Sequence, residues 1–253
     1  MVGRASPVLT RRRAALGAAL AGFLAAYYAA HESLADLSLW GDVVFLALWL
    51  IPAVFALVWL ALPYREARGL LLLILAFLVA TVIFEAADLG ALANFSKLGL
   101  MTSFGFWFLG FFESVTWVTL VALVIPVVDS FSVWRGPTRH IVEQEPQLFD
   151  VFSFAFPFPG ENVSANLGLP DLLFFALFLA AAARWRLRVG WTWIALCASI
   201  GVTMWLAVAW DVAGLPALPG LSFGFVIPNA DLLWREYRRW RQEREGPQHA
   251  GPP

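Results

Sequence analysis

Long runs of apolar residues, separated by short polar or charged segments, fill most of the chain. A membrane-spanning helix needs about 20 mostly apolar residues, within a range of roughly 17–25. The runs of this kind predict eight such helices. They lie at about 13–30, 40–62, 69–88, 98–112, 114–134, 167–184, 189–211 and 215–233. We therefore expect an all-α fold, a membrane bundle of about eight transmembrane helices.

The spacing of these runs divides the chain into three regions. Residues 1–112 hold the N-terminal transmembrane helices, and residues 113–233 hold a second group of helices with an outer loop at 135–166. Residues 234–253 are basic and then rich in Gly and Pro, which predicts a disordered tail. Within the outer loop, FDVFSFAFPFPG suits either a short strand or an aromatic segment lying on the membrane surface.

The composition supports a membrane protein and excludes several kinds of site. Of the 253 residues, 60% are hydrophobic and 14% are charged, whereas soluble domains are nearer half apolar and a quarter charged. The single cysteine, Cys197, rules out a disulfide within the chain and a C-x-x-C site. The three histidines are too far apart to show metal-ligand spacing. We expect a lipid bilayer around the protein, and no metal, cofactor or nucleic-acid partner.

The positive charges predict the orientation in the membrane. Loops on the cytoplasmic side carry an excess of Lys and Arg. With the N-terminus inside, only Lys97, Arg135 and Arg139 of the 17 Lys and Arg residues fall in outer segments. We therefore expect both termini in the cytoplasm, and the Ala- and Arg-rich composition suggests a prokaryotic plasma membrane. The first span also resembles a signal peptide, as an uncleaved signal anchor would.

Two aspartates interrupt the apolar runs at similar depth. Asp129 lies in VTLVALVIPVVDSFSVW, and Asp171 stands close to the start of the next span. The two spans run in opposite directions, so both aspartates fall near the outer end of the bundle. A charged Asp at the centre of a membrane helix costs roughly 2.5–3.5 kcal/mol, and such residues usually face the bundle interior. The sequence therefore predicts a facing pair.

Such a pair can do acid–base chemistry. Two carboxylates about 3 Å apart cannot both ionise easily, so they share a proton. One then activates a water as general base while the other protonates the substrate carbonyl as general acid, without a nucleophilic side chain or a metal. Other readings stay open. Asp171 follows Pro170, an ordinary way to begin a helix, and Asp129 alone could be a polar helix contact or a proton relay.

Three motifs, taken in order, resemble the GxGD-type intramembrane aspartyl proteases, the family of presenilins, signal peptide peptidases and microbial homologues. WVTLVALVIPVVDSFSVWRGPTRHIVE is similar to the presenilin segment around the first catalytic aspartate. NLGLPD stands where the family carries Gly-x-Gly-Asp, and Pro216-Ala217-Leu218 matches the Pro-Ala-Leu of its last span. The resemblance covers about residues 114–225.

The resemblance implies a function and a site. It implies that Asp129 and Asp171 are the catalytic pair of an intramembrane endopeptidase whose substrate is a transmembrane peptide or membrane protein. It also implies a set of substrate-positioning residues: Gly168, Leu169, Pro170, Pro216, Ala217 and Leu218. A helical substrate must unwind locally, and the segment before Asp171 could pair with it as a strand. The expected orientation is that of signal peptide peptidases, which implies substrates with a cytoplasmic N-terminus, such as leftover signal peptides.

Two positions depart from the family pattern and keep other hypotheses open. Val128 replaces the tyrosine before the first aspartate, and Pro170 replaces the glycine before the second. One alternative is a catalytically inactive relative that binds membrane helices. Another is a transporter that uses the two aspartates as a proton or cation site, although the chain shows no inverted repeat. The sequence does not indicate an oligomeric state.

Overall fold

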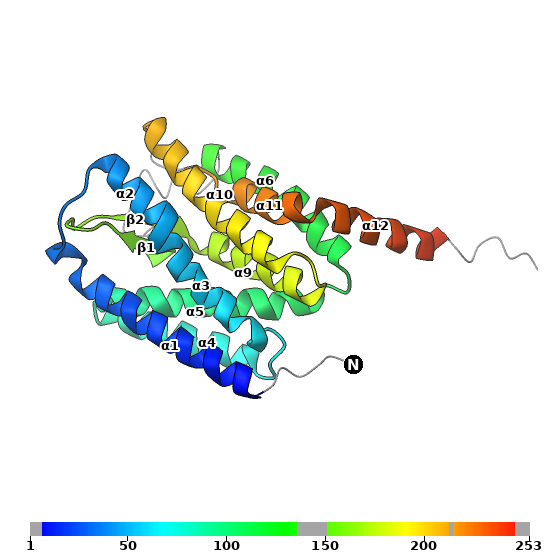
Figure 1. Ribbon diagram of the computed structural model, residues 1–253, viewed down its shortest axis with the longest axis horizontal. Coiled ribbons are helices and arrows are strands. Elements are labelled where there is room, and N and C mark those ends of the chain that lie inside the picture. Colours follow the sequence, from blue (N-terminus) through cyan, green and yellow to red (C-terminus); the bar gives the residue numbers. More distant parts are fainter. Residues whose placement is uncertain (1–6, 136–150, 213–214, 246–253) are drawn as a thin grey trace, which may run out of the picture.

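The computed structural model describes residues 7–135, 151–212 and 215–245, which form a helical bundle with one β-hairpin (Figure 1). The first half contains α1 (Pro7–Ala30), α2 (Leu39–Phe45), α3 (Ile51–Ala61), α4 (Leu70–Ala86), α5 (Gly90–Phe108) and α6 (Val115–Arg135). The second half contains β1 (Ser153–Pro157), β2 (Ser164–Gly168), α9 (Leu169–Arg184), α10 (Val189–Ala209), α11 (Leu218–Val226) and α12 (Ala230–Glu245). A π-helical segment, Leu46–Leu50, joins α2 to α3.

Several helices have the length and surface of membrane spans. Within the described residues, four helical segments are long and apolar enough to cross a bilayer: Arg11–Ser33, Leu39–Tyr64, Val115–Ser132 and Val189–Ala209. Helix α4 is apolar but shorter, and its outer face exposes leucines and valines such as Leu72 and Val82. In water such a surface would be unfavourable, whereas lipid tails solvate it well. The chain is thus a helical protein with several apolar helices suited to a membrane.

Helix α9 lies at the centre of the bundle. Every residue from Leu177 to Ala182 is fully buried, as expected for a helix that other helices surround. Helices α5, α10 and α11 all pack against it. The approach of α5 is close because Gly105 has no side chain: a Cβ there would lie 2.7 Å from the carbonyl oxygen of Leu173.

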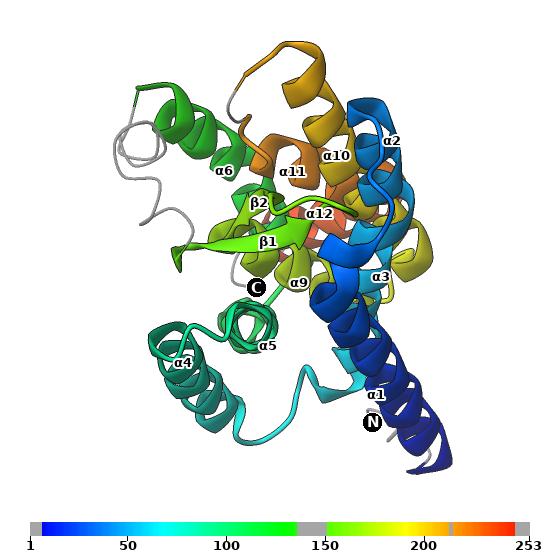
Figure 2. The ribbon, with the colours of Figure 1, turned by 90° about the vertical axis from the view of Figure 1, so that its left-hand side faces the viewer.

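The β-hairpin lies across one end of the bundle (Figure 2). Its strands are antiparallel, with Ser153 opposite Gly168 and Pro157 opposite Ser164. Strand β2 ends at Gly168 and α9 begins at the next residue, Leu169. The hairpin therefore leads directly into the central helix, and a side chain in the first turn of α9 must lie beside β2.

The structure differs from the sequence predictions in four respects. The count of eight spans is not confirmed, because four helical segments in the described part meet the length and hydropathy of a span. The hairpin adds two strands to a fold expected to be all-α, and one of them, SFAFP, lies in the segment for which a short strand was one of the two expectations. Helix α5 begins at Gly90 instead of residue 98, so Lys97 lies inside a helix and not in a loop.

The fourth difference concerns the C-terminal region. The eighth predicted span is a short helix, α11, which ends at Val226 before a 3-10 turn containing Pro228. The chain then continues as α12 to Glu245, so the prediction of a disordered tail is wrong for residues 234–245. Trp234, Tyr237 and Trp240, spaced three residues apart, contact one another along α12, and Trp240 also contacts Trp117 of α6. Residues 246–253 of the predicted tail lie outside the described part.

Candidate functional site

Asp129 lies in the last third of α6, on a partly buried face of the helix. Pro126 stands inside the same helix, one turn earlier. Because proline lacks an N–H, one backbone carbonyl of the preceding turn loses its helical donor there. Val128, where the resembling family has tyrosine, is 55% exposed on the outer surface of α6. A side chain at position 128 therefore lies on the exposed surface of the helix.

Asp171 lies in the first turn of α9 and is partly buried. Pro170 also occupies this first turn, where its missing N–H has no helical partner to lose. The backbone of Gly168 hydrogen-bonds the Asp171 carboxyl. A Cβ added at Gly168 would stand 3.2 Å from Oδ2 of Asp171. Glycine at this position thus gives the carboxyl room to lie over the end of β2.

The two aspartates are neighbours in the structure. Helices α6 and α9 are in contact, and the carboxyl of Asp171 interacts electrostatically with that of Asp129. The two groups come from consecutive predicted spans, 42 positions apart along the chain. The two carboxyls therefore lie within electrostatic range of each other, which is a first requirement of a shared-proton pair.

The Pro-Ala-Leu segment also meets this pair. Ala217 caps α11 and Leu218 is its first residue. The backbone N–H of Leu218 donates a hydrogen bond to Oδ2 of Asp129, with 3.1 Å between nitrogen and oxygen. The first N–H groups of a helix have no partner inside the helix, so a carboxylate at this end satisfies one of them and favours the positive end of the dipole. Pro216 stands one residue before the cap.

Of the remaining residues expected to position substrate, Gly168 and Leu169 join β2 to α9. The structure therefore gathers three segments far apart in sequence: the Asp129 turn of α6, the β2–α9 junction with Asp171, and the start of α11. The family-like residues that follow α6, Gly136, Pro137, Arg139, Val142 and Glu143, lie outside the described residues.

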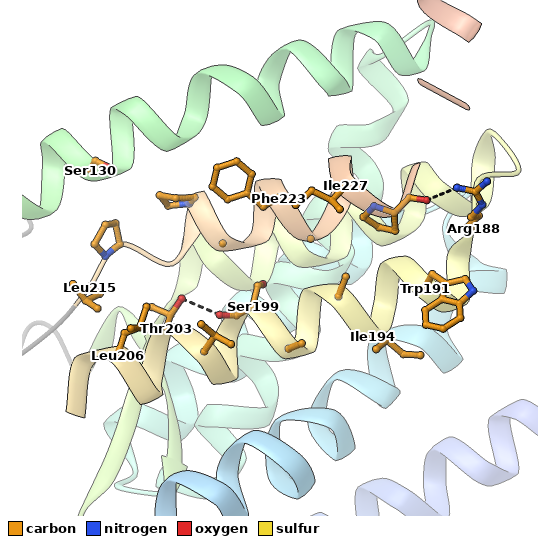
Figure 3. A pocket seen from close by; sticks show the side chains of 18 residues that line it. Ser130, Arg188, Trp191, Ile194, Ser199, Thr203, Leu206, Leu215, Phe223 and Ile227 are labelled. Atoms are coloured by element: carbon orange, nitrogen blue, oxygen red, sulfur yellow. Dashed lines mark hydrogen bonds between the residues drawn. The ribbon is translucent and has the colours of Figure 1, made fainter. Parts of the chain in front are cut away.

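A cavity of about 900 Å³ runs along the groove between α10 and α11 (Figure 3). Ser130, which follows Asp129, and Pro216, two residues before Leu218, line one end of it, and Arg188 lines the other end. Neither aspartate lines it. The hydroxyls of Ser199 and Thr203 are bonded to carbonyls of their own helix, so the groove presents a mainly apolar surface. It is therefore a groove beside the aspartates.

The structure also contains a buried polar cluster that the sequence analysis did not identify. Asn94 and Lys97 of α5 are 4% exposed each, and both bond to the backbone of β1. Tyr27 and Tyr28 of α1 bond to the same strand. The sequence contains a signal for this cluster. Asn94 and Lys97 are three residues apart, so they share one face of a helix, and most of the residues around them are apolar or small.

Among the described residues, no group of three or more His, Cys, Asp or Glu is arranged to hold a metal ion. Comparisons with protein-family models, with curated proteins and with solved structures found no match to this chain. The functional assignment therefore rests on the residues and their geometry.

Proposed function

We propose that the protein is an intramembrane aspartyl protease that hydrolyses peptide bonds in transmembrane segments. The observation that carries the proposal is the meeting of three sequence motifs around one carboxyl. Asp129 accepts a hydrogen bond from the N–H of Leu218, and Asp171 lies within electrostatic reach of Asp129. In the protease family that the sequence resembles, these same three motifs form the catalytic centre.

The proposed reaction needs only the two carboxyls and a water. The pair holds one proton between two oxygens. The ionised carboxyl removes a proton from the water, whose oxygen attacks the carbonyl carbon, while the protonated carboxyl donates its proton to the carbonyl oxygen. The tetrahedral intermediate then collapses, the C–N bond breaks, and the amine leaves with a proton. The N–H of Leu218 stabilises negative charge on Asp129 throughout this cycle.

Strand β2 offers a place for the unwound substrate. Unwinding a helix in a membrane frees backbone groups that need partners. An extended peptide that adds to a sheet edge satisfies them, and alternate side-chain pockets then fix its register. Because β2 runs directly into the turn that carries Asp171, a peptide bound along it would pass the carboxyl pair. The apolar groove between α10 and α11 could accommodate apolar parts of a substrate or lipid nearby.

The membrane arrangement belongs to the same proposal. It has eight spans, both termini in the cytoplasm of a prokaryote, and the aspartates near the outer face. Asn162, at the exposed tip of the hairpin, tests this orientation. A cysteine placed there should react in intact cells with a reagent that does not cross the membrane. Native Cys197 is buried and should stay unlabelled, and labelling of residue 162 only after the cells are opened would refute the orientation.

The catalytic assignment is tested by incubating the purified protein in detergent with a labelled single-span peptide. Asp129→Asn and Asp171→Asn should each abolish cleavage. Asp211→Asn is the matched control, because Asp211 is exposed at a positive φ of 52°, a conformation that Asn adopts readily. Cleavage that survives in either of the first two variants would rule out the pair as the catalyst.

A non-catalytic relative that binds membrane helices is the second candidate, and Pro170 is the observation that favours it. Its ring stands in the first turn of α9, beside Asp171, where the resembling family has glycine. If the peptide binds but no form cleaves it, Pro170→Gly should be assayed next. Cleavage gained by this variant would show that the proline ring suppresses an otherwise complete site.

A further inference from the structure

Side chains bond the carbonyls along the outer edge of β1. In an antiparallel strand, successive residues direct their backbone groups to opposite sides. In β1 the carbonyls of Ser153, Ala155 and Pro157 point away from β2, and each accepts a hydrogen bond from a side chain of α1 or α5. Figure 2 shows β1 as the strand nearer α5. The helices therefore take the place of a third strand.

Asn94 makes the most strand-like of these contacts. Its Nδ2 donates to the carbonyl of Ala155 at 2.7 Å, and its Oδ1 accepts from the N–H of Ala155 at 2.9 Å. The hydroxyl of Tyr28 donates to the same carbonyl at 2.8 Å, and that of Tyr27 donates to the carbonyl of Pro157 at 2.7 Å. A side-chain amide that bonds both groups of one residue imitates the pairing of a neighbouring strand.

Lys97 anchors the start of β1 with a buried charge. Its Nζ donates to the carbonyl of Ser153 at 3.1 Å and forms an ion pair with Glu85 at 2.7 Å. The Lys97 side chain is only 5% exposed. Burying an ammonium is costly unless it is paired and hydrogen-bonded. We therefore expect the buried Lys97 ammonium to have a specific role, and its hydrogen bond to Ser153 indicates that this role is to hold β1 in place.

We propose that Asn94 and Lys97 are positioning residues that hold the hairpin formed before substrate arrives. The inference rests on the proposed protease function. An isolated two-stranded hairpin is marginally stable at best, so β1 and β2 need external contacts to remain ordered. With β1 held by α1 and α5, β2 is presented beside Asp171 in a fixed register. A binding site that is already ordered avoids the cost of ordering it during binding.

Amide hydrogen exchange on the substrate-free protein tests the clamp directly. The amides of residues 154–156, 165 and 167, which face the other strand or bond to Asn94, should be protected, and Asn94→Leu, which keeps the side-chain size, should speed their exchange at least tenfold. The matched control is Asn229→Leu. Asn229 is also a fully buried asparagine with hydrogen bonds to backbone groups, including Arg188 N–H and the Phe225 carbonyl, but it is bonded to α10, α11 and their junctions.

Peptide cleavage distinguishes positioning from a merely structural role. If only one tenth of the variant molecules hold an ordered hairpin, apparent affinity falls by that fraction, so Asn94→Leu should raise KM about tenfold with kcat nearly unchanged. Asn229→Leu should leave KM unchanged. Should Asn94→Leu not yield folded protein, Tyr27→Phe combined with Tyr28→Phe removes two donors to β1 with little change in volume and should shift KM in the same direction.

The outcomes separate the two proposals. Unprotected hairpin amides in the native protein, or equal exchange in Asn94→Leu and Asn229→Leu, would overturn the clamp. A fall in kcat at constant KM in Asn94→Leu would also overturn it, because that result indicates fewer active molecules and not a less ordered site. If no form cleaves any peptide, the protease proposal fails, while hydrogen exchange still decides whether the clamp exists.

Discussion

Gly105 is where a single added methyl group should disturb the candidate site most measurably. In a Gly105→Ala variant, the new Cβ would lie 2.7 Å from the carbonyl oxygen of Leu173 and 3.0 Å from the Cβ of Ala176. The first of these atoms is backbone and cannot rotate away, so α5 and α9 must separate by several tenths of an ångström. Because α9 begins with the turn that carries Asp171, cleavage should fall together with stability.

The expected magnitude follows from two opposing effects. Overpacking of this kind costs about 1–3 kcal/mol. Alanine is favoured over glycine within a helix by up to about 1 kcal/mol. Gly22→Ala isolates the second effect, because no atom lies within 4 Å of a Cβ built at Gly22 in α1. The difference in unfolding free energy between the two variants should therefore be about 2 kcal/mol, or roughly 30-fold in the folded-to-unfolded ratio.

The difference can be measured by titrating detergent micelles with a denaturing detergent and following the fluorescence of the 13 tryptophans. Gly22→Ala should unfold at the same point as the native protein or slightly later, and Gly105→Ala clearly earlier. If the two variants unfold within about 0.5 kcal/mol of each other, α5 and α9 are not in the close contact described, and the reasoning fails.

Four further substitutions give distinct results. Gly168→Ala should lower cleavage more than stability, because its Cβ would displace the nearby carboxyl of Asp171 by only a few tenths of an ångström. Equal losses would contradict this. Glu85→Gln should destabilise the protein by about 2–3 kcal/mol, because it removes the carboxylate that pairs with the Lys97 ammonium, which is only 5% exposed. Lys97→Met should cost less, because the Glu85 carboxylate that it leaves behind is 34% exposed. Thermal unfolding of both variants would check this, and the reverse order would refute it. Hydrogen bonds from Arg188 lower the pKa of Asp231, so their contact should stabilise above about pH 4 and be lost as pH falls through the lowered pKa. Unfolding curves of Asp231→Asn should lack that acid-side loss.

The positions of the helices were largely predictable, because most long apolar runs correspond to one helix, although the runs 40–62 and 215–233 each divide into several helical segments. The hairpin was also accessible, since FSFAFP alternates residues as a half-buried strand does. The boundaries were less predictable where polar residues are buried. Lys97 was read as part of an outer loop because an isolated ammonium seldom enters a helix in the bundle. Its partner, Glu85, belongs to another helix, and their pairing depends on tertiary structure.

The candidate site divides in a similar way. Motifs predicted which segments carry Asp129 and Asp171, and the structure brings these residues together with Leu218. The N–H of Leu218 as a donor to Asp129 was not predictable, because it depends on where α11 begins. Whether the pair is catalytic stays a prediction. Asn94 was missed because an amide in a membrane helix has many roles, and only the register of β1 against α5 shows which backbone groups it bonds.

The bonds from Tyr27 and Tyr28 to β1 have a consequence for how the protein is made. Tyr27 and its acceptor, Pro157, are 130 residues apart, so the first helix must wait in the membrane until the hairpin has been synthesised. A signal peptidase that removed the first span, after the small residues at its end, would take both hydroxyls from the sheet. The resemblance of this span to a signal peptide therefore conflicts with its place in the fold. These bonds therefore favour an uncleaved signal anchor that stays in the fold after it has entered the membrane.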